Sequence, residues 1–177
     1  AEAVDAWVLF YRTVLGLEPH GQLEMAEPYG LMRSRAVVDS ARRLRITLNV
    51  SEGRNSAMAR SLTTFAGAGV HHFAFACDDI FTTVARLKSA GTAFLSIPDN
   101  YYDDLEARFD LDSGLIEQLR ANGILYDRTP DGEFFHAPTE SFLNRFAFEI
   151  VERRGRYDGH GESNAPVFLA AQYHGSG

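Results

Sequence analysis

Two adjacent histidines stand in the segment GVHHFAFACDD, at residues 69–79. The stretch from Val70 to Cys77 is predicted to be a strand, and neighbouring residues of a strand point to opposite faces of the sheet. His72 then shares its face with two alanines, whose small side chains leave room beside the imidazole. His71 shares the other face with two phenylalanines and a cysteine. We expect this bulky face to pack under a helix, with His71 packed or hydrogen-bonded there.

A glutamate occupies a similar setting in the second strong strand, RFAFEIVER at residues 145–153. Alternation places Glu149 between Ala147 and Val151 on the less bulky face. A carboxylate buried there without a partner would be costly, and a cation would remove that cost. His72 and Glu149 are therefore the two strong candidates for metal ligands.

The chemistry of these two side chains admits several divalent metals. Imidazole suits iron, zinc, copper or nickel, whereas carboxylate also admits magnesium and manganese. Two histidines and one carboxylate with open positions are typical of non-heme Fe(II) oxygenases. His136, in GEFFHAPT, is a third candidate. The simpler alternatives are a hydrogen-bonded core or surface histidine at His72, a solvated Glu149 on an open face, and a polar strand end at His136.

The elements that position these side chains follow from hydrophobic periodicity and turn residues. Helices are predicted over 4–15, 55–65, 79–87 and 167–172, and one or two more between 99 and 127; strands are predicted over 31–38, 44–50, 70–77, 94–97, 133–136 and 145–153. The order suggests two related βαβββ modules. Residues 1–68 form a partial first module whose opening strand is missing, and residues 69–177 form a second module with inserted helices and a C-terminal tail.

Composition narrows the class of protein. The chain has 177 residues, 45% of them hydrophobic, and a formal net charge of -7, which argues against a nucleic-acid partner. No apolar run approaches the ~18 residues of a membrane span. Cys77 is the one cysteine, so an internal disulfide is excluded and a cytoplasmic location is expected. The chain starts without Met inside a helical pattern, and we expect one domain cut from a longer protein.

Several motifs resemble a known family. GVHHFAFACDDI, FLSIPDNYYDDL and RFAFEIVERRG are similar, in this order, to segments of the 4-hydroxyphenylpyruvate dioxygenases, which belong to the vicinal-oxygen-chelate superfamily. The resemblance implies an α+β fold with paired βαβββ modules and a curved mixed sheet around a metal cavity. It assigns the metal-binding histidine to His72, not His71, and the metal-binding glutamate to Glu149. The third ligand, a histidine of the opening strand, is expected upstream of Ala1.

The resemblance also implies pocket positions. Ser34 and Asn49 match pocket-lining positions, His136 stands where the family has a glutamine, and Asn164 is a fourth pocket candidate, in the segment GHGESNAP. The aromatic residues of the family's C-terminal pattern GFGxGNFKALFE are missing here, which argues against oxidation of 4-hydroxyphenylpyruvate. The expected cofactor is a divalent metal: Fe²⁺, Mg²⁺, Mn²⁺ or Co²⁺.

The ending NAPVFLAAQ resembles the C-terminal half of bacterial two-part 3-dehydroshikimate dehydratases. In that family a sugar-isomerase-like barrel dehydrates 3-dehydroshikimate to protocatechuate in quinate and shikimate catabolism. The resemblance implies a metal-dependent lyase with a covalently fused N-terminal barrel. It also implies a small-molecule ligand, either a keto acid or a shikimate-pathway compound, and it leaves a homo-oligomer open. Two alternatives stand beside it: a genuine Fe(II) α-keto-acid dioxygenase, and a degenerate structural or dimerisation module.

Overall fold

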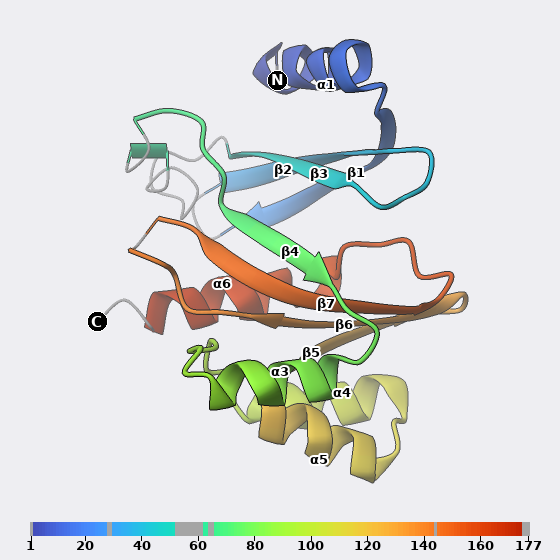
Figure 1. Cartoon of the computed structure of the whole chain (residues 1–177), viewed down its shortest axis with the longest axis vertical. Helices are drawn as coiled ribbons and strands as arrows, with labels where there is room; N and C mark the ends of the chain where they lie inside the picture. The colour runs from blue at the N-terminus through green and yellow to red at the C-terminus, as the bar shows by residue number, and fades with distance from the viewer. Residues whose placement is uncertain (1, 28–29, 52–61, 64–65, 144, 175–177) are drawn as a thin grey trace. The chain divides into compact units, whose positions relative to one another are not determined.

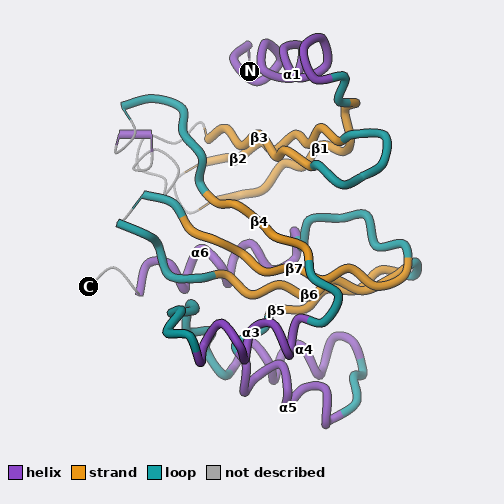
Figure 2. Tube along the Cα trace, viewed as in Figure 1, coloured by secondary structure: helices purple, strands orange, loops and turns teal. Residues whose placement is uncertain are grey.

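The computed structural model describes residues 2–27, 30–51, 62–63, 66–143 and 145–174. The chain divides into two compact units, Ala1–Gly69 and Val70–Gly177, and Figures 1 and 2 show the elements of each. The helix predicted over 55–65 falls almost wholly outside the described residues. Among the residues that the structure does describe, no helix combines the length and apolar content needed to cross a membrane.

The first unit is a helix packed on a three-stranded antiparallel sheet. Its elements are α1 (Glu2–Leu15), β1 (Glu18–Glu27), β2 (Gly30–Val38) and β3 (Arg45–Ser51), in the sheet order β1-β2-β3. Val4 and Val8 of α1 pack against Val37 and its neighbours in the sheet. Gly16, at a φ of 65°, ends the helix, and its N–H donates to the Arg12 carbonyl.

The second unit holds a mixed four-stranded sheet. Its strands are β4 (His72–Ala76), β5 (Leu125–Thr129), β6 (Gly132–Pro138) and β7 (Ala147–Gly155), in the order β4-β7-β6-β5. β4 is parallel to β7, whereas the other pairs are antiparallel. The α+β class is thereby confirmed. The strand predicted over 94–97 is wrong, because Phe94 forms only an isolated bridge with Thr139.

Helices cover one face of this sheet. These helices are α3 (Ile80–Ser89), α4 (Asn100–Phe109) and α5 (Ser113–Asn122). Two further helices follow β7 in the chain: η1 (Glu162–Asn164), which leads directly into α6 (Ala165–His174). The fully buried core side chains include Ile80, Leu105 and Leu119. Tyr101 and Tyr102 of α4 are also buried, although two aspartates follow them directly in the sequence.

A buried carboxylate ties α3 to the sheet. The Ile80 N–H donates to Glu152 Oε2 over 2.9 Å, and Arg154 Nε donates to Glu152 Oε1 over 2.6 Å. Glu152 is only 5% exposed to solvent. The carboxylate of Glu152 therefore lies against the N-terminus of α3, where unpaired N–H groups and the helix dipole favour a negative charge.

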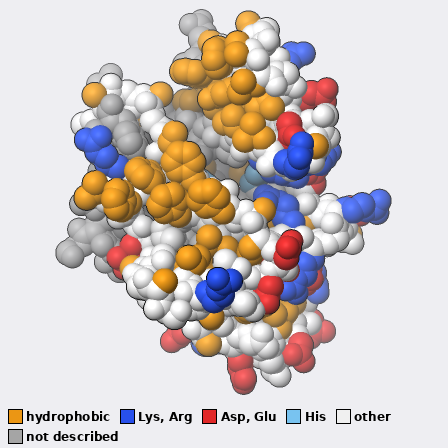
Figure 3. All heavy atoms as spheres, in the orientation of Figure 1, with side chains coloured by type: hydrophobic (Ala, Val, Ile, Leu, Met, Phe, Trp, Pro, Cys, Tyr) orange, Lys and Arg blue, Asp and Glu red, His pale blue; other side chains and the backbone are white. Residues whose placement is uncertain are grey.

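The prediction for the bulky face of β4 is wrong. Phe73 is 46% exposed and Phe75 is 55% exposed, and both contact the ring of Phe148, which is itself 38% exposed. The physical reason is the place of β4 at the edge of its sheet, while α3 contacts the inner strands β6 and β7. Apolar side chains consequently gather at the surface over this strand (Figure 3).

Candidate metal centre

Strand register places three of the sequence candidates on one face of the second unit's sheet. His72 lies opposite Ala147 and Ala74 opposite Glu149 in the β4–β7 pair, and His136 lies opposite Val151 in the β6–β7 pair. Because directly paired residues share a face, His72, Glu149 and His136 project from three adjacent strands to the same side. This is the side away from Phe135 and Ile150, which pack in the core with the helices.

Glu149 lies between the two histidines. Its Oε1 is 2.6 Å from His136 Nδ1, and its Oε2 is 3.9 Å from His72 Nε2. The side chain of Glu149 is 14% exposed and that of His136 is 6% exposed, whereas that of His72 is 34% exposed. Burial raises the pKa of Glu149, but the electrostatic interaction and hydrogen bond with His136, with the electrostatic interactions of His72 and Arg153, more than reverse this, so the pKa is lowered. Glu149 therefore stays ionised and able to bind a cation.

His71 and His72 lie together, which corrects the expectation that they occupy opposite faces. Their Nδ1 atoms are 3.1 Å apart, and the rings meet edge to face at 5.4 Å and 87°. The reason is local, because β4 begins at His72 and strand alternation does not extend to the residue before it. The expected hydrogen-bond partner of His71 is thus His72. Since Nδ1 of His72 faces His71, its Nε2 is the nitrogen turned toward Glu149.

The pKa of His71 gives a pH prediction. Burial, followed by the neighbouring charge of His72, lowers this pKa to about 4, and Glu149 opposes the shift. The unfolded chain takes up a proton near pH 6.5, whereas folded His71 does so only near pH 4. Stability is therefore lost as the pH falls from about 6.5 to 4, by up to about 3 kcal/mol. Urea unfolding at pH 7 and pH 4.5 should show a smaller loss in His71→Gln than in the parent, and an equal loss would contradict the assignment.

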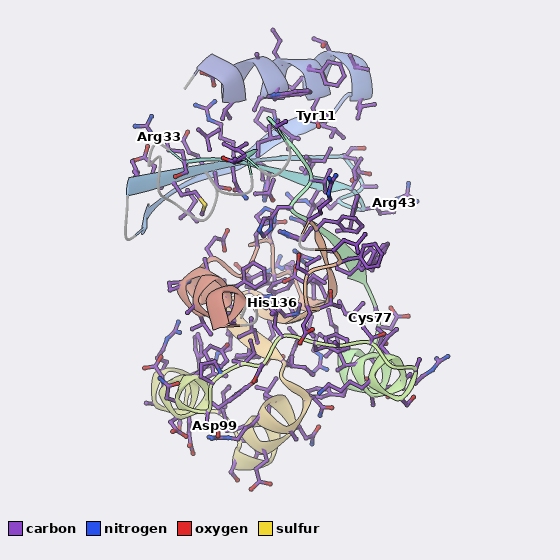
Figure 4. The ribbon with its side chains drawn as sticks, turned by 90° about the vertical axis from the view of Figure 1, so that its left-hand side faces the viewer. Tyr11, Arg33, Arg43, Cys77, Asp99 and His136 are labelled. Carbon is purple, nitrogen blue, oxygen red and sulfur yellow. The ribbon has the colours of Figure 1, made fainter. Side chains whose placement is uncertain are left out.

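The structure also brings Asn164 to this site. Its Nδ2 lies 2.9 Å from His136 Nε2, and the same nitrogen donates to the Tyr126 carbonyl over 3.0 Å. The Tyr101 hydroxyl donates to Asn164 Oδ1 over 3.0 Å. Asn164 is fully buried, and Figure 4 shows His136 close to α6. Two of the four pocket candidates thus belong to one hydrogen-bonded group beside Glu149.

Ser34 and Asn49, the other pocket candidates, lie in the first unit. They are directly opposite each other in the β2–β3 pair. Val37, Ile46 and Leu48 alternate with them and pack toward α1, so Ser34 and Asn49 lie on the face of that sheet turned away from the helix. Ser34 and Asn49 are therefore cross-strand neighbours in the first unit, whereas the other two pocket candidates lie in the second unit.

Phe168 is a site residue that sequence analysis missed. Its ring, on α6, lies 6.2 Å from that of His71 and 6.3 Å from that of His72. Although the family's C-terminal aromatic pattern is missing from this sequence, Phe168 places an aromatic ring edge to face with both histidines. The signal available in the sequence was the one aromatic residue in VFLAAQ.

The donors fit part of a divalent metal site. Two ligands about 2.1 Å from one ion, at right angles, lie about 3 Å apart, so His72 Nε2 and Glu149 Oε2 need only a small side-chain movement from their 3.9 Å. Within the described ranges, no group of three or more His, Cys, Asp or Glu side chains is placed to hold a metal. His72 and Glu149 are therefore two candidate ligands, and the described residues place no third one beside them.

Comparison with protein families agrees with this fold. Residues 1–136 match the family described as the Glyoxalase/Bleomycin resistance protein/Dioxygenase superfamily. The chain belongs to this superfamily. A 4-hydroxymandelate synthase variant from Streptomyces coelicolor has a similar structure, with a TM-score of 0.83 and 27% identity over 94% of this chain and 48% of that one.

Longer proteins contain a similar stretch of sequence. The chain is 51% identical over 172 residues to a 3-dehydroshikimate dehydratase of Pseudomonas aeruginosa, covering 97% of this chain but 27% of that protein. It is 30% identical to a 4-hydroxyphenylpyruvate dioxygenase of the same organism, over 91% of this chain and 45% of that one. A solved xylose isomerase-like TIM barrel/4-hydroxyphenylpyruvate dioxygenase fusion protein matches all of this chain and 28% of its own, with a TM-score of 0.81 and 46% identity. The chain thus spans about a quarter of the dehydratase and of the fusion protein.

Proposed function

We propose that this chain is the metal-binding, dioxygenase-like portion of a 3-dehydroshikimate dehydratase, and that His72 and Glu149 hold its divalent metal. The observation that carries the proposal is the 51% identity to a 3-dehydroshikimate dehydratase along 97% of this chain. The metal site is supported by the distance of 3.9 Å between His72 Nε2 and Glu149 Oε2, which face each other. When bound, the metal would act as a Lewis acid that polarises an oxygen of the bound small molecule.

The third ligand belongs to a strand preceding α1. In the second unit β7 is flanked by β4 as well as β6, whereas among the described strands of the first unit β3 pairs only with β2. A strand pairing with β3 would complete a βαβββ module in the first unit. Fe²⁺, Mg²⁺, Mn²⁺ and Co²⁺ all remain candidates for such a site.

The dehydration itself belongs to a fused barrel. The relatives are much longer than this chain, and one solved relative is a TIM-barrel fusion. The barrel would convert 3-dehydroshikimate to protocatechuate, while this portion binds a keto acid or a shikimate-pathway compound through its metal. We infer a cytoplasmic location for the protein.

The dehydratase proposal is tested on the full-length protein. Incubation with 3-dehydroshikimate and each candidate metal should yield protocatechuate, detected by chromatography. The variant Glu149→Gln should keep dehydration within a few fold, because that residue lies outside the barrel. Absence of protocatechuate with every metal would contradict the assignment.

A dioxygenase is the second candidate, favoured by the likeness to 4-hydroxyphenylpyruvate dioxygenase and 4-hydroxymandelate synthase. The Fe(II)-loaded full-length protein is mixed with arylpyruvates in an oxygen electrode. The dehydratase proposal expects no oxygen uptake above the metal-free control. Uptake that Glu149→Gln abolishes would instead assign oxygenase chemistry to this portion.

A further inference from the structure

The orientation of the Asn164 side-chain amide is set by its partners. One end of the amide faces the Tyr126 carbonyl at 3.0 Å, and a carbonyl oxygen only accepts hydrogen bonds. The other end lies 3.0 Å from the Tyr101 hydroxyl, whose single proton can go to this end or to the Tyr126 carbonyl 3.1 Å away, so the contact with the carbonyl decides the orientation. The end facing the carbonyl is therefore the NH₂ group. Its second N–H points at His136 Nε2, 2.9 Å away.

This orientation determines which nitrogen of His136 carries the proton. An amide N–H only donates, so His136 Nε2 accepts and holds no proton. In the neutral imidazole the proton is then on Nδ1, the atom 2.6 Å from Glu149 Oε1. A protonated ring nitrogen has no lone pair for a metal. His136 is thus a donor to Glu149 and is excluded as the third metal ligand.

The surroundings hold the His136 ring in place. It stacks on Phe134 with centroids 5.0 Å apart and planes at 21°. Gly161 approaches so closely that a Cβ there would lie 2.8 Å from the Phe134 ring and 3.3 Å from His136 Nε2. His136 is 5% exposed and Asn164 is fully buried. Rotation of the ring would break its buried hydrogen bond with Asn164 and its partly buried one with Glu149.

We propose that Asn164 and His136 act as a positioning pair that fixes Glu149 as a one-oxygen metal ligand. The Nδ1–H of His136 occupies Oε1, which leaves Oε2 directed toward His72 Nε2. The pair thereby selects the number of donor oxygens and the orientation of the carboxylate. This inference rests on the proposed metal site at His72 and Glu149. Outer hydrogen-bond partners of metal ligands commonly change metal affinity by about 10- to 100-fold.

Two substitutions separate hydrogen bonding from packing. His136→Phe keeps a flat ring but removes the donor, whereas His136→Gln keeps an N–H that can reach Glu149. Mn²⁺ binding to the metal-free full-length protein is measured by calorimetry and by the loss of the free Mn²⁺ paramagnetic resonance signal. We expect about 10- to 100-fold weaker binding in His136→Phe and a change below about threefold in His136→Gln. Unchanged affinity in His136→Phe would overturn the proposal. Weakening of more than tenfold in His136→Gln would do so as well, even if His136→Phe fails to fold.

Tyr101→Phe is the control for a purely structural network. It removes a hydroxyl from the same buried group but leaves the Asn164 amide bonded to the Tyr126 carbonyl and to His136. It should lower the unfolding temperature and leave Mn²⁺ affinity within about threefold of the parent. If Tyr101→Phe and His136→Phe weaken Mn²⁺ binding equally, the network acts only through stability and the proposal is wrong.

Failure of the metal site is distinguishable from failure of the positioning pair. A parent protein that binds no Mn²⁺, or binds it equally well as Glu149→Gln, overturns both proposals. A parent whose binding depends on Glu149 but not on the His136 donor overturns the positioning pair alone.

Discussion

The variants His72→Ala and Glu149→Gln are each expected to lower the bound divalent metal of the full-length protein by at least about tenfold. The two side chains face each other across adjacent strands at 3.9 Å, and each would supply one ligand. Loss of a ligand removes more affinity than loss of an outer partner, which already costs about 10- to 100-fold. The measurement is elemental analysis after loading with one metal and dialysis against buffer.

A matched control lies three residues away on the same strand. Glu152 is also a buried carboxylate of β7, but it faces α3 rather than the histidines. Glu152→Gln should therefore retain the metal content of the parent. Equal metal content in the parent, His72→Ala and Glu149→Gln would refute the site, and loss in Glu152→Gln alone would show that stability governs the measurement.

Replacement of Glu152 by alanine is expected to destabilise α3 by about 3 kcal/mol. The change leaves the buried Ile80 N–H without its acceptor and removes the partner of Arg154. Breaking such a buried, charge-assisted interaction costs about 2–5 kcal/mol. Hydrogen exchange of peptides covering α3 should then be about 100-fold less protected in the full-length protein.

Asp79→Ala calibrates this measurement on the same helix. Asp79 caps α3 by accepting from the Thr82 N–H at 3.1 Å, in an exposed position. Removal of such a cap costs about 1 kcal/mol. If Glu152→Ala reduced the protection of α3 no more than Asp79→Ala does, the buried carboxylate would not be the main anchor of the helix.

Local pattern predicted most of the elements but not all of the strands. β2, β3 and β7 follow alternating or β-branched runs, and α5 ends at Gly123, whose φ is 66°. β1 was missed because EPHGQLEMAE contains no β-branched residue and bends where its register shifts at Gly21. β5 was missed because its five residues follow a helix directly and become a strand only through pairing with β6.

The alternation of side chains along a strand, here called strand parity, predicted part of the candidate site. Parity placed His72 and Glu149 on the less bulky faces of their strands, and the register confirms that they share one face. It failed for His71, which precedes β4, and for the exposed Phe73, whose surroundings depend on where the helices lie. The contact of Asn164 with His136 joins residues 28 apart, and no local pattern encodes it.

The most direct test of the account is anomalous X-ray diffraction from crystals of the full-length protein loaded with Co²⁺. We predict an anomalous peak about 2 Å from both His72 Nε2 and Glu149 Oε2, with a further ligand from a strand preceding α1 and with His136 Nδ1 bonded to Glu149 Oε1. A peak coordinated by His136, or the absence of any peak beside His72 and Glu149, would contradict the account.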